Sequence, residues 1–300
     1  MDGIIQAVPN FSEGKDSTVY ERIIDIFRKA DGVKLIDYFP DVDFNRTVVT
    51  VLGRPGPLKE ALLKMTELSV TLIDMRRQTG AHPRIGALDT IPVLPLKGIT
   101  LEECRDLAEQ IGHEIFKRFK VPVYFSGANA RKPERRDLDH IRRGGFEALL
   151  QVAHTPERSP DIGPPALHPS AGAVIVSAGT QPLVAYNVML GTDDLEVAKK
   201  IAKIVRGPTG GFVSIRAIGM IYQEQKRACV SMNVFDHRAT PLYRLFELVR
   251  FEAARYNVPV VASQLVGVVP SSVLLDSVCH YLKLDDFKRE QILEEHLHDL

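Results

Sequence analysis

The stretch VKLIDYFPDVDFNRTVVTVLG, residues 33–53, decides how the first half of the chain folds. It holds two runs rich in valine, isoleucine, leucine and threonine, residues 33–39 and 45–53, joined by the turn-prone segment 40–44. Such runs on either side of a turn predict two neighbouring strands. Two strands in direct succession are not the simple alternation of strands and helices that builds a parallel sheet.

The segments outside this pair extend the pattern in both directions. Residues 3–8 form a short apolar run typical of a strand, and Asp16 is placed to cap a helix that precedes residue 33. After the pair, Pro57 opens a second helix with a leucine-rich face, and residues 87–96 form a strand whose prolines indicate the edge of a sheet. The order strand–helix–strand–strand–helix–strand is the split βαβ, or ferredoxin-like, unit.

The second half repeats this order without repeating the residues. One helix is capped by Asp193 and another begins at Thr240 and Pro241. The strands around them, two of which are joined by a turn at 223–226, are expected at residues 182–190, 211–222, 227–235 and 258–267. We therefore predict an α+β protein with two ferredoxin-like subdomains in tandem, residues 1–178 and 179–300.

The region between the two units mixes regular and irregular segments. Thr100 and Glu103 form a capping box for a helix, and residues 121–127 are a further strand. The charged run 131–145 is typical of a helix with a solvated face. Residues 154–173, rich in proline and glycine, fit either an inert spacer or a ligand-binding loop, and composition does not decide between them.

Composition limits the classes of function. The chain has 38 Lys and Arg residues against 38 Asp and Glu residues, so no global field draws it to nucleic acid or to an acidic membrane. The first ten residues carry an acid where a secretory signal needs positive charge, and no apolar run has the length of a membrane span. Three widely separated cysteines predict no disulfide staple, and we expect a cytoplasmic protein.

Two histidines on loops are candidates for proton transfer. His82 stands between an alanine and Pro83, which restricts its backbone and suits a positioned base, although a solvated loop histidine gives the same pattern. His168 lies in the stiff segment GPPALHPSAG, residues 163–172, and is either a second proton carrier or a structural residue.

Polar residues on apolar strands are the other candidates. Asn45 and Arg46 open one strand and Arg216 interrupts another. A sheet with one solvated face shows the same alternation, but an arginine in mid-strand needs an anion or an acidic partner. The chain has no P-loop, no GxGxxG after a strand, no GxSxG and no HExxH, and its scattered histidines predict no metal site.

Six segments together carry a resemblance to a known family. They are VPNFSEG (8–14), NRTVVT (45–50), HPRIGALD (82–89), GPPALHPSAGA (163–173), LVAYNVML (183–190) and SQLVGVVP (263–270). In this order and spacing they resemble the formiminotransferase family, from about residue 3 to about residue 285. The resemblance implies two ferredoxin-like subdomains that flank a folate-binding cleft or tunnel, a homodimer, and tetrahydrofolate as co-substrate without a metal.

The resemblance also implies an activity and site residues. The reaction is transfer of the formimino group of N-formimino-L-glutamate to tetrahydrofolate, which gives 5-formimino-tetrahydrofolate and glutamate in histidine degradation, with His82 as general acid and base. To this mechanism we add, independently of the resemblance, Asp89 or Asp41 as a candidate to orient His82 by accepting its other N–H. The folate-binding segment falls on Gly163, Pro164, Pro165, Ala166, Leu167, His168, Pro169, Ser170, Ala171 and Gly172. The candidates to bind substrate are Asn10, Asn45, Arg46, Arg84 and Arg216.

Two alternatives stay open at this point. The enzyme class could hold with a formyl donor in place of the formimino donor. A non-catalytic folate-binding or amino-acid-binding protein is a different class, against which the retained sequence His82-Pro83-Arg84 argues.

Overall fold

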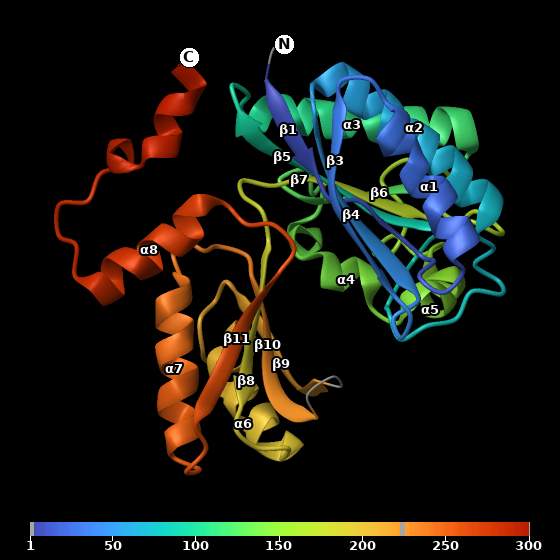
Figure 1. The fold of residues 1–300 in the computed structure, drawn as a ribbon. Coiled ribbons are helices and arrows are strands. Elements are labelled where there is room, and N and C mark those ends of the chain that lie inside the picture. Colours follow the sequence, from blue (N-terminus) through green and yellow to red (C-terminus); the bar gives the residue numbers. More distant parts are fainter. Residues whose placement is uncertain (1–2, 223–225, 300) are drawn as a thin grey trace. The chain divides into compact units, whose positions relative to one another are not determined.

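A computed structural model describes residues 3–222 and 226–299, so most of the turn expected at 223–226 lies outside it. The chain forms two compact units, Met1–Thr180 and Gln181–Leu300, and each has its own hydrophobic core. Both units combine a sheet with helices (Figure 1), which confirms the predicted α+β class with two ferredoxin-like subdomains.

The first unit is built on a seven-stranded sheet. Its strands are β1 (Ile4–Ala7), β2 (Asn10–Phe11), β3 (Val33–Asp41), β4 (Arg46–Gly53), β5 (Leu88–Lys97), β6 (Val123–Gly127) and β7 (Val174–Ala178). Because β1 and β2 both pair with β4 on one side and β5 on the other, they act as one interrupted strand. The spatial order β3, β4, β1/β2, β5 is the ferredoxin-like order, and β7 and β6 extend it by parallel pairing.

Three long helices, α1 (Ser17–Lys29), α2 (Pro55–Leu72) and α3 (Leu101–Phe119), pack beside one another and against this sheet (Figure 1). Asp16 caps α1 by accepting a hydrogen bond from the Thr18 N–H, and Thr100 and Glu103 form the predicted capping box of α3. The second helix starts at Pro55, one half-turn before the predicted Pro57, because Pro55 fits the first helical position equally well.

The second unit repeats the order with β8 (Val184–Leu190), α6 (Leu195–Val205), β9 (Ile215–Tyr222), β10 (Arg227–Val234), α7 (Leu242–Ala254) and β11 (Val260–Val266). Its four strands are antiparallel in the order β11-β8-β10-β9. Asp194, not the predicted Asp193, caps α6 by accepting from the Glu196 N–H. The C-terminal α8 (Ser271–Leu282) was not predicted.

The prediction that residues 87–96 form an edge strand is wrong. β5 pairs with β1 and β2 on one side and with β7 on the other. Pro92 is tolerated because β5 changes partner there, from β2 to β1, and its carbonyl oxygen accepts from the Val8 N–H at 3.1 Å. Pro95 lies beside an irregularity in the β1–β5 register, where a missing N–H costs little.

Two expectations for the connecting region also need correction. Residues 154–173 are not a spacer between the halves, because β7 follows them and pairs with β5 and β6 inside the first unit. The charged run 131–145 is not simply a solvated face. It folds into a 3₁₀ turn, Pro133–Arg136, and the short helix α4 (Leu138–Arg142), followed by α5 (Gly145–Val152), and the side chain of Arg135 is only 2% exposed against Asp161.

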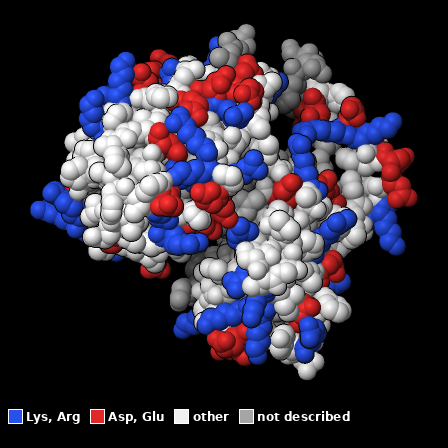
Figure 2. Space-filling model, turned by 180° about the vertical axis from the view of Figure 1, so that it is seen from behind, with Lys and Arg blue, Asp and Glu red and all other residues white. Residues whose placement is uncertain are grey.

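One face of the molecule carries both signs of charge side by side (Figure 2). On the face shown in Figure 2, Lys and Arg side chains alternate with Asp and Glu side chains rather than gathering by sign. Among the helices in the described part of the chain, none combines the length and the apolar character needed to cross a bilayer.

Candidate active site

His82 lies in the loop between α2 and β5, and its side chain is only 6% exposed. The edge of its ring meets Phe44, with the two ring centroids 6.4 Å apart. The backbone of the loop turns tightly here, since the Arg84 N–H donates to the His82 carbonyl oxygen at 2.8 Å. The interpretation of His82 as a solvated loop histidine is therefore wrong.

A buried carboxylate holds the imidazole. His82 Nε2 lies 3.3 Å from Oδ2 of Asp89, which is fully buried near the start of β5. The other oxygen, Oδ1, accepts from the Ile85 N–H at 2.7 Å, and Arg142 donates through Nη2 to Oδ2. Burial alone would raise the pKa of Asp89, but the charge of Arg142 and the hydrogen bond from His82 outweigh it and lower that pKa to about 2. Asp89 is therefore ionised at neutral pH.

The ionised Asp89 determines how His82 carries its proton. A carboxylate only accepts hydrogen bonds, so Nε2 bears the N–H and Nδ1 bears a lone pair. Nδ1 has no hydrogen-bond partner among the residues that the structure describes. Burial lowers the pKa of His82, Asp89 opposes that effect, and the charges of Arg142 and Arg46 add to it. The imidazole is thus neutral near pH 7 and able to accept a proton at Nδ1.

Arg46, at the start of β4, adds a cation to this group. Its guanidinium lies over the Phe44 ring, 5.7 Å from the centroid. Within the described residues the buried Nε atoms of Arg46 and Arg142 have no hydrogen-bond partner. Burial lowers the pKa of Arg46, while Asp41 and Asp89 raise it. Unpaired guanidinium N–H groups beside a neutral imidazole suit an anionic ligand.

Arg84 makes its hydrogen bonds to other residues of the protein. Its Nε donates to Gln78 Oε1 at 2.5 Å, and Nη2 donates to the Gln78 carbonyl oxygen at 2.7 Å. The same guanidinium binds both carboxylate oxygens of Glu147, at 3.1 and 2.7 Å. These bonds fasten the His82 loop to α5 and occupy most of the donors that a substrate carboxylate would need.

The two asparagines connect neighbouring segments. Asn45, with a positive φ of 48°, accepts from the Gly14 N–H at 3.0 Å and donates to the Thr79 carbonyl oxygen at 2.8 Å. Asn10 on β2 donates to Thr90 Oγ1 at 2.9 Å. Asn45 therefore ties the start of β4 to the loop that holds His82.

The predicted folate-binding segment lies directly beside the His82 loop. The Ala87 N–H donates to the Ala171 carbonyl oxygen at 2.9 Å, and the Ala173 N–H donates to that of Ile85 at 3.1 Å. Gly86 and Gly172 face each other in this antiparallel bridge. A Cβ on Gly86 would lie 2.0 Å from the Ala173 oxygen, and one on Gly172 would lie 2.2 Å from the Ile85 oxygen, so only glycine fits at both positions.

His168 shapes the turn that ends this segment. Its Nδ1 accepts from the Ala171 N–H at 3.0 Å, and its backbone pairs with Gly172 in both directions. The two paired segments share one pattern, HPRIGA at 82–87 and HPSAGA at 168–173. This repetition of His-Pro-x-x-Gly-Ala was not among the sequence predictions.

The remaining candidate, Arg216, belongs to the second unit. It lies on β9 with its guanidinium 5.9 Å from the centroid of the Phe235 ring, and its Nη1 donates to the Val213 carbonyl oxygen at 3.4 Å.

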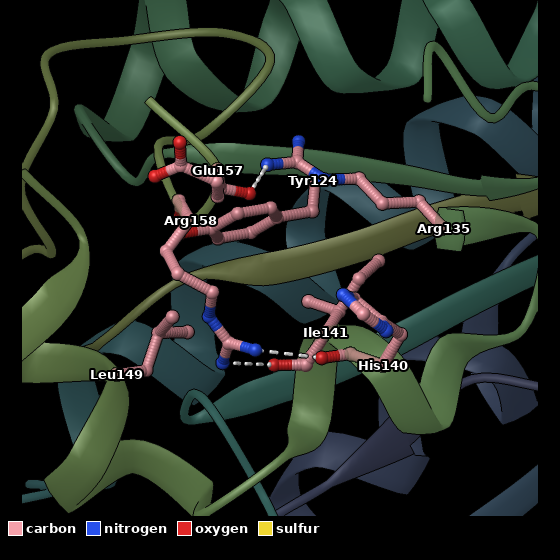
Figure 3. Close-up of a pocket in the computed structure, with 7 residues that line it drawn as sticks. All are labelled: Tyr124, Arg135, His140, Ile141, Leu149, Glu157 and Arg158. Atoms are coloured by element: carbon pink, nitrogen blue, oxygen red, sulfur yellow. Dashed lines mark hydrogen bonds between the residues drawn. The ribbon is translucent and has the colours of Figure 1, made fainter. Parts of the chain in front are cut away.

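A small cavity beneath α4 is not a ligand site. Figure 3 shows its lining, with Arg158 directed at the carbonyl oxygens of His140 and Ile141, and Tyr124 and Arg135 above them. Its volume of about 10 Å³ has room for one water molecule at most. No group of three or more His, Cys, Asp or Glu residues able to hold a metal occurs in the described ranges.

Fold and site together define a class: a two-unit ferredoxin-like protein in which a buried carboxylate orients a neutral histidine beside free guanidinium donors. The chain belongs to the formiminotransferase family. The model of the formiminotransferase domain, N-terminal subdomain, matches residues 4–179, and that of the formiminotransferase domain matches residues 185–298.

Curated relatives agree with this membership. A glutamate formimidoyltransferase of Streptococcus pyogenes serotype M1 is 38% identical over 99% of this chain and 99% of its own length. A glutamate formimidoyltransferase of Thermoplasma acidophilum is 38% identical over 97% of this chain and 96% of its own length. The formimidoyltransferase-cyclodeaminase of Gallus gallus is 39% identical over 94% of this chain, which matches 53% of that longer protein.

Proposed function

We propose that this protein is a glutamate formimidoyltransferase, which moves the formimino group of N-formimino-L-glutamate to tetrahydrofolate and yields 5-formimino-tetrahydrofolate and glutamate. Full-length similarity to two curated glutamate formimidoyltransferases supports the reaction. The observation in the structure that carries it is the buried pair of His82 and Asp89 with a lone pair at Nδ1. We further propose that the protein acts in histidine degradation as a homodimer, as the family resemblance implies, and that it does so in the cytoplasm, as its three scattered cysteines suggest.

The proposed mechanism needs one proton carrier. The N5 amine of tetrahydrofolate attacks the formimino carbon and forms a tetrahedral intermediate, in which that carbon is bonded to N5, to its own former imino nitrogen and to the glutamate nitrogen. Nδ1 of His82 takes the proton that N5 loses and returns it to the glutamate nitrogen as the bond from that nitrogen to the formimino carbon breaks and the C=N bond re-forms. One imidazole with a pKa near the working pH contributes about 10²–10⁴-fold by this route. Holding the two substrates together supplies the rest.

The other residues bind and position. The segment Gly163–Gly172 is proposed to hold the folate, and its hydrogen bonds to residues 85–87 support this by bringing it to the His82 loop. Arg46, with its unpaired Nε, is the candidate for the glutamate carboxylate. Arg216 is the candidate from the second unit for a carboxylate of the folate tail. Arg84 is proposed to hold the loop rather than a ligand, because Gln78 and Glu147 engage it.

The variant His82→Ala tests the assignment. We expect turnover at least about a hundredfold lower, because the proton carrier is lost, with folate affinity unchanged. His154→Ala is the matched control, since that histidine is exposed. Unchanged turnover of His82→Ala would remove His82 from the mechanism.

Two comparisons separate the alternatives. Formimino-glutamate and formyl-glutamate, assayed side by side, identify the donor. Folate binding without turnover of either donor would favour a non-catalytic folate-binding protein.

A further inference from the structure

Arg142 has a place in the site that the proposed reaction does not yet use. It is the last residue of α4, its side chain is 14% exposed, and it donates to the same oxygen of Asp89 that His82 contacts. Asp89 thus stands between a guanidinium from α4 and an imidazole from the loop before β5. A shift of Arg142 would therefore alter the position and the charge balance of the carboxylate that orients the imidazole.

The position of Arg142 is itself fixed by its neighbours. A helix of five residues is too short to be stable alone. Arg158 donates to the carbonyl oxygens of His140 at 2.7 Å, Ile141 at 2.9 Å and Arg143 at 3.2 Å, on both sides of Arg142 in sequence (Figure 3 shows the first two). Asp137 caps the other end by accepting from the Asp139 N–H at 3.0 Å. Several hydrogen bonds therefore stabilise the short helix α4, which places Arg142 against Asp89.

We propose that Arg142 is a positioning residue for His82: it holds the Asp89 carboxylate against Nε2, so that Nδ1 presents its lone pair to the substrate. This proposal rests on the proposed function of His82 as the proton carrier. Arg142 acts through Asp89 and is not itself assigned a contact with the reacting atoms.

The charges around His82 set the direction of the expected effect. Asp89 faces it from β5, Arg142 from α4 and Arg46 from β4, and Asp41 lies beside Arg46. The positive charge of Arg142 disfavours the imidazolium and also offsets the charge of Asp89. Removal of that charge therefore raises the pKa of His82 and lowers the fraction of neutral base at pH 7.

Arg142→Gln tests the proposal, with Arg142→Lys as the charge-retaining variant and Arg143→Gln as the control. Arg143 is adjacent and exposed, so its replacement makes the same change in net charge away from Asp89. The titration of His82 is followed by ¹⁵N NMR, which also reports which ring nitrogen carries the proton. The pH profile of kcat/KM for formimino transfer and the affinity for tetrahydrofolate are measured on the same variants.

We expect Arg142→Gln to raise the pKa of His82 by about one unit and to lower kcat/KM by up to about tenfold at pH values well below that pKa, with tetrahydrofolate affinity unchanged. Arg142→Lys recovers much of the loss, and Arg143→Gln changes neither quantity. An unmoved His82 titration in Arg142→Gln, or an equal effect of Arg143→Gln, would overturn the proposal.

Two further outcomes remain decisive. If Arg142→Gln does not fold, the titration of His82 in Arg142→Lys decides: a rise in the pKa smaller than that expected for Arg142→Gln supports the proposal, because the ammonium keeps the charge without the guanidinium geometry, and an unmoved titration would overturn it. If the wild type transfers no formimino group, the proposed function fails. The NMR titration still shows whether Arg142 controls His82.

Discussion

Replacing Asp89 by asparagine tests the orientation of the base without removing the base. The new side chain has the same shape, and its amide oxygen can still accept from the Ile85 N–H, the bond that Asp89 Oδ1 makes at 2.7 Å. The amide nitrogen then replaces Oδ2, opposite His82 Nε2 and Arg142 Nη2. The amide nitrogen and the Arg142 guanidinium can only donate hydrogen bonds. His82 Nε2 must therefore accept one, which forces the imidazole into the tautomer with its proton on Nδ1.

The expected magnitudes follow from this geometry. With its lone pair turned away from the substrate, His82 loses its general-base contribution, and we expect kcat about 10²–10⁴-fold lower. Arg142 also loses the carboxylate of a nearly buried pair, which lowers the free energy of unfolding by about 3 kcal/mol. Single-turnover formimino transfer at saturating substrates, together with denaturant unfolding, measures both quantities.

Asp41→Asn is the matched control, since Asp41 is the other carboxylate that could have oriented His82. Asp41 caps its own turn, accepting from the Phe44 N–H at 2.9 Å. We expect Asp41→Asn to keep most of the activity. A variant Asp89→Asn that turns over like the wild type, or whose ¹⁵N spectrum shows the proton still on Nε2, would refute the reasoning.

Three more outcomes are expected. Gly172→Ala places a Cβ 2.2 Å from the Ile85 carbonyl oxygen at a φ of +72°, so we expect the free energy of unfolding measured with denaturant to fall by about 2–4 kcal/mol. The control Gly210→Ala, at a φ of +100° with no atom within 4 Å, should show only the smaller cost of the backbone conformation. Glu147→Gln should cost at most about 1 kcal/mol, because the Glu147 side chain is 64% exposed, and a larger loss by calorimetry would contradict this. The pKa of Asp89 is lowered from 3.8 to about 2, so its stabilising effect is complete above pH 3.8 and is lost as the pH falls towards 2. Unfolding curves should therefore show that the difference in the free energy of unfolding between wild type and Asp89→Asn shrinks over that pH range.

Much of the fold could be predicted because local signals agree with it. The apolar runs around residues 33–53 became β3 and β4, and the caps at Asp16 and Thr100 became helix starts. The position of β5 could not be predicted, because Pro92 normally excludes a central strand. Only the interruption between β1 and β2, a tertiary feature, leaves room for a residue without an N–H.

The site was predictable in part for a similar reason. The resemblance named His82 and the segment 163–172, whereas the loop residues around Pro83 were compatible with a solvated histidine as well as with a held imidazole. Arg142 could not be singled out, because it is one of several arginines in a charged run and only the fold brings it to Asp89. Arg84 was singled out from the sequence as a candidate to bind substrate. Its hydrogen bonds to Gln78 and Glu147 within the protein could not be predicted from residue spacing.

The contact between Gly86 and Gly172 leaves no space between the backbone of the His82 loop and that of the segment 163–172. Because backbone touches backbone there, neither loop has room to shift towards the other at this point. Under the proposed function, the loop that holds the folate and the loop that carries His82 would therefore behave as one rigid element.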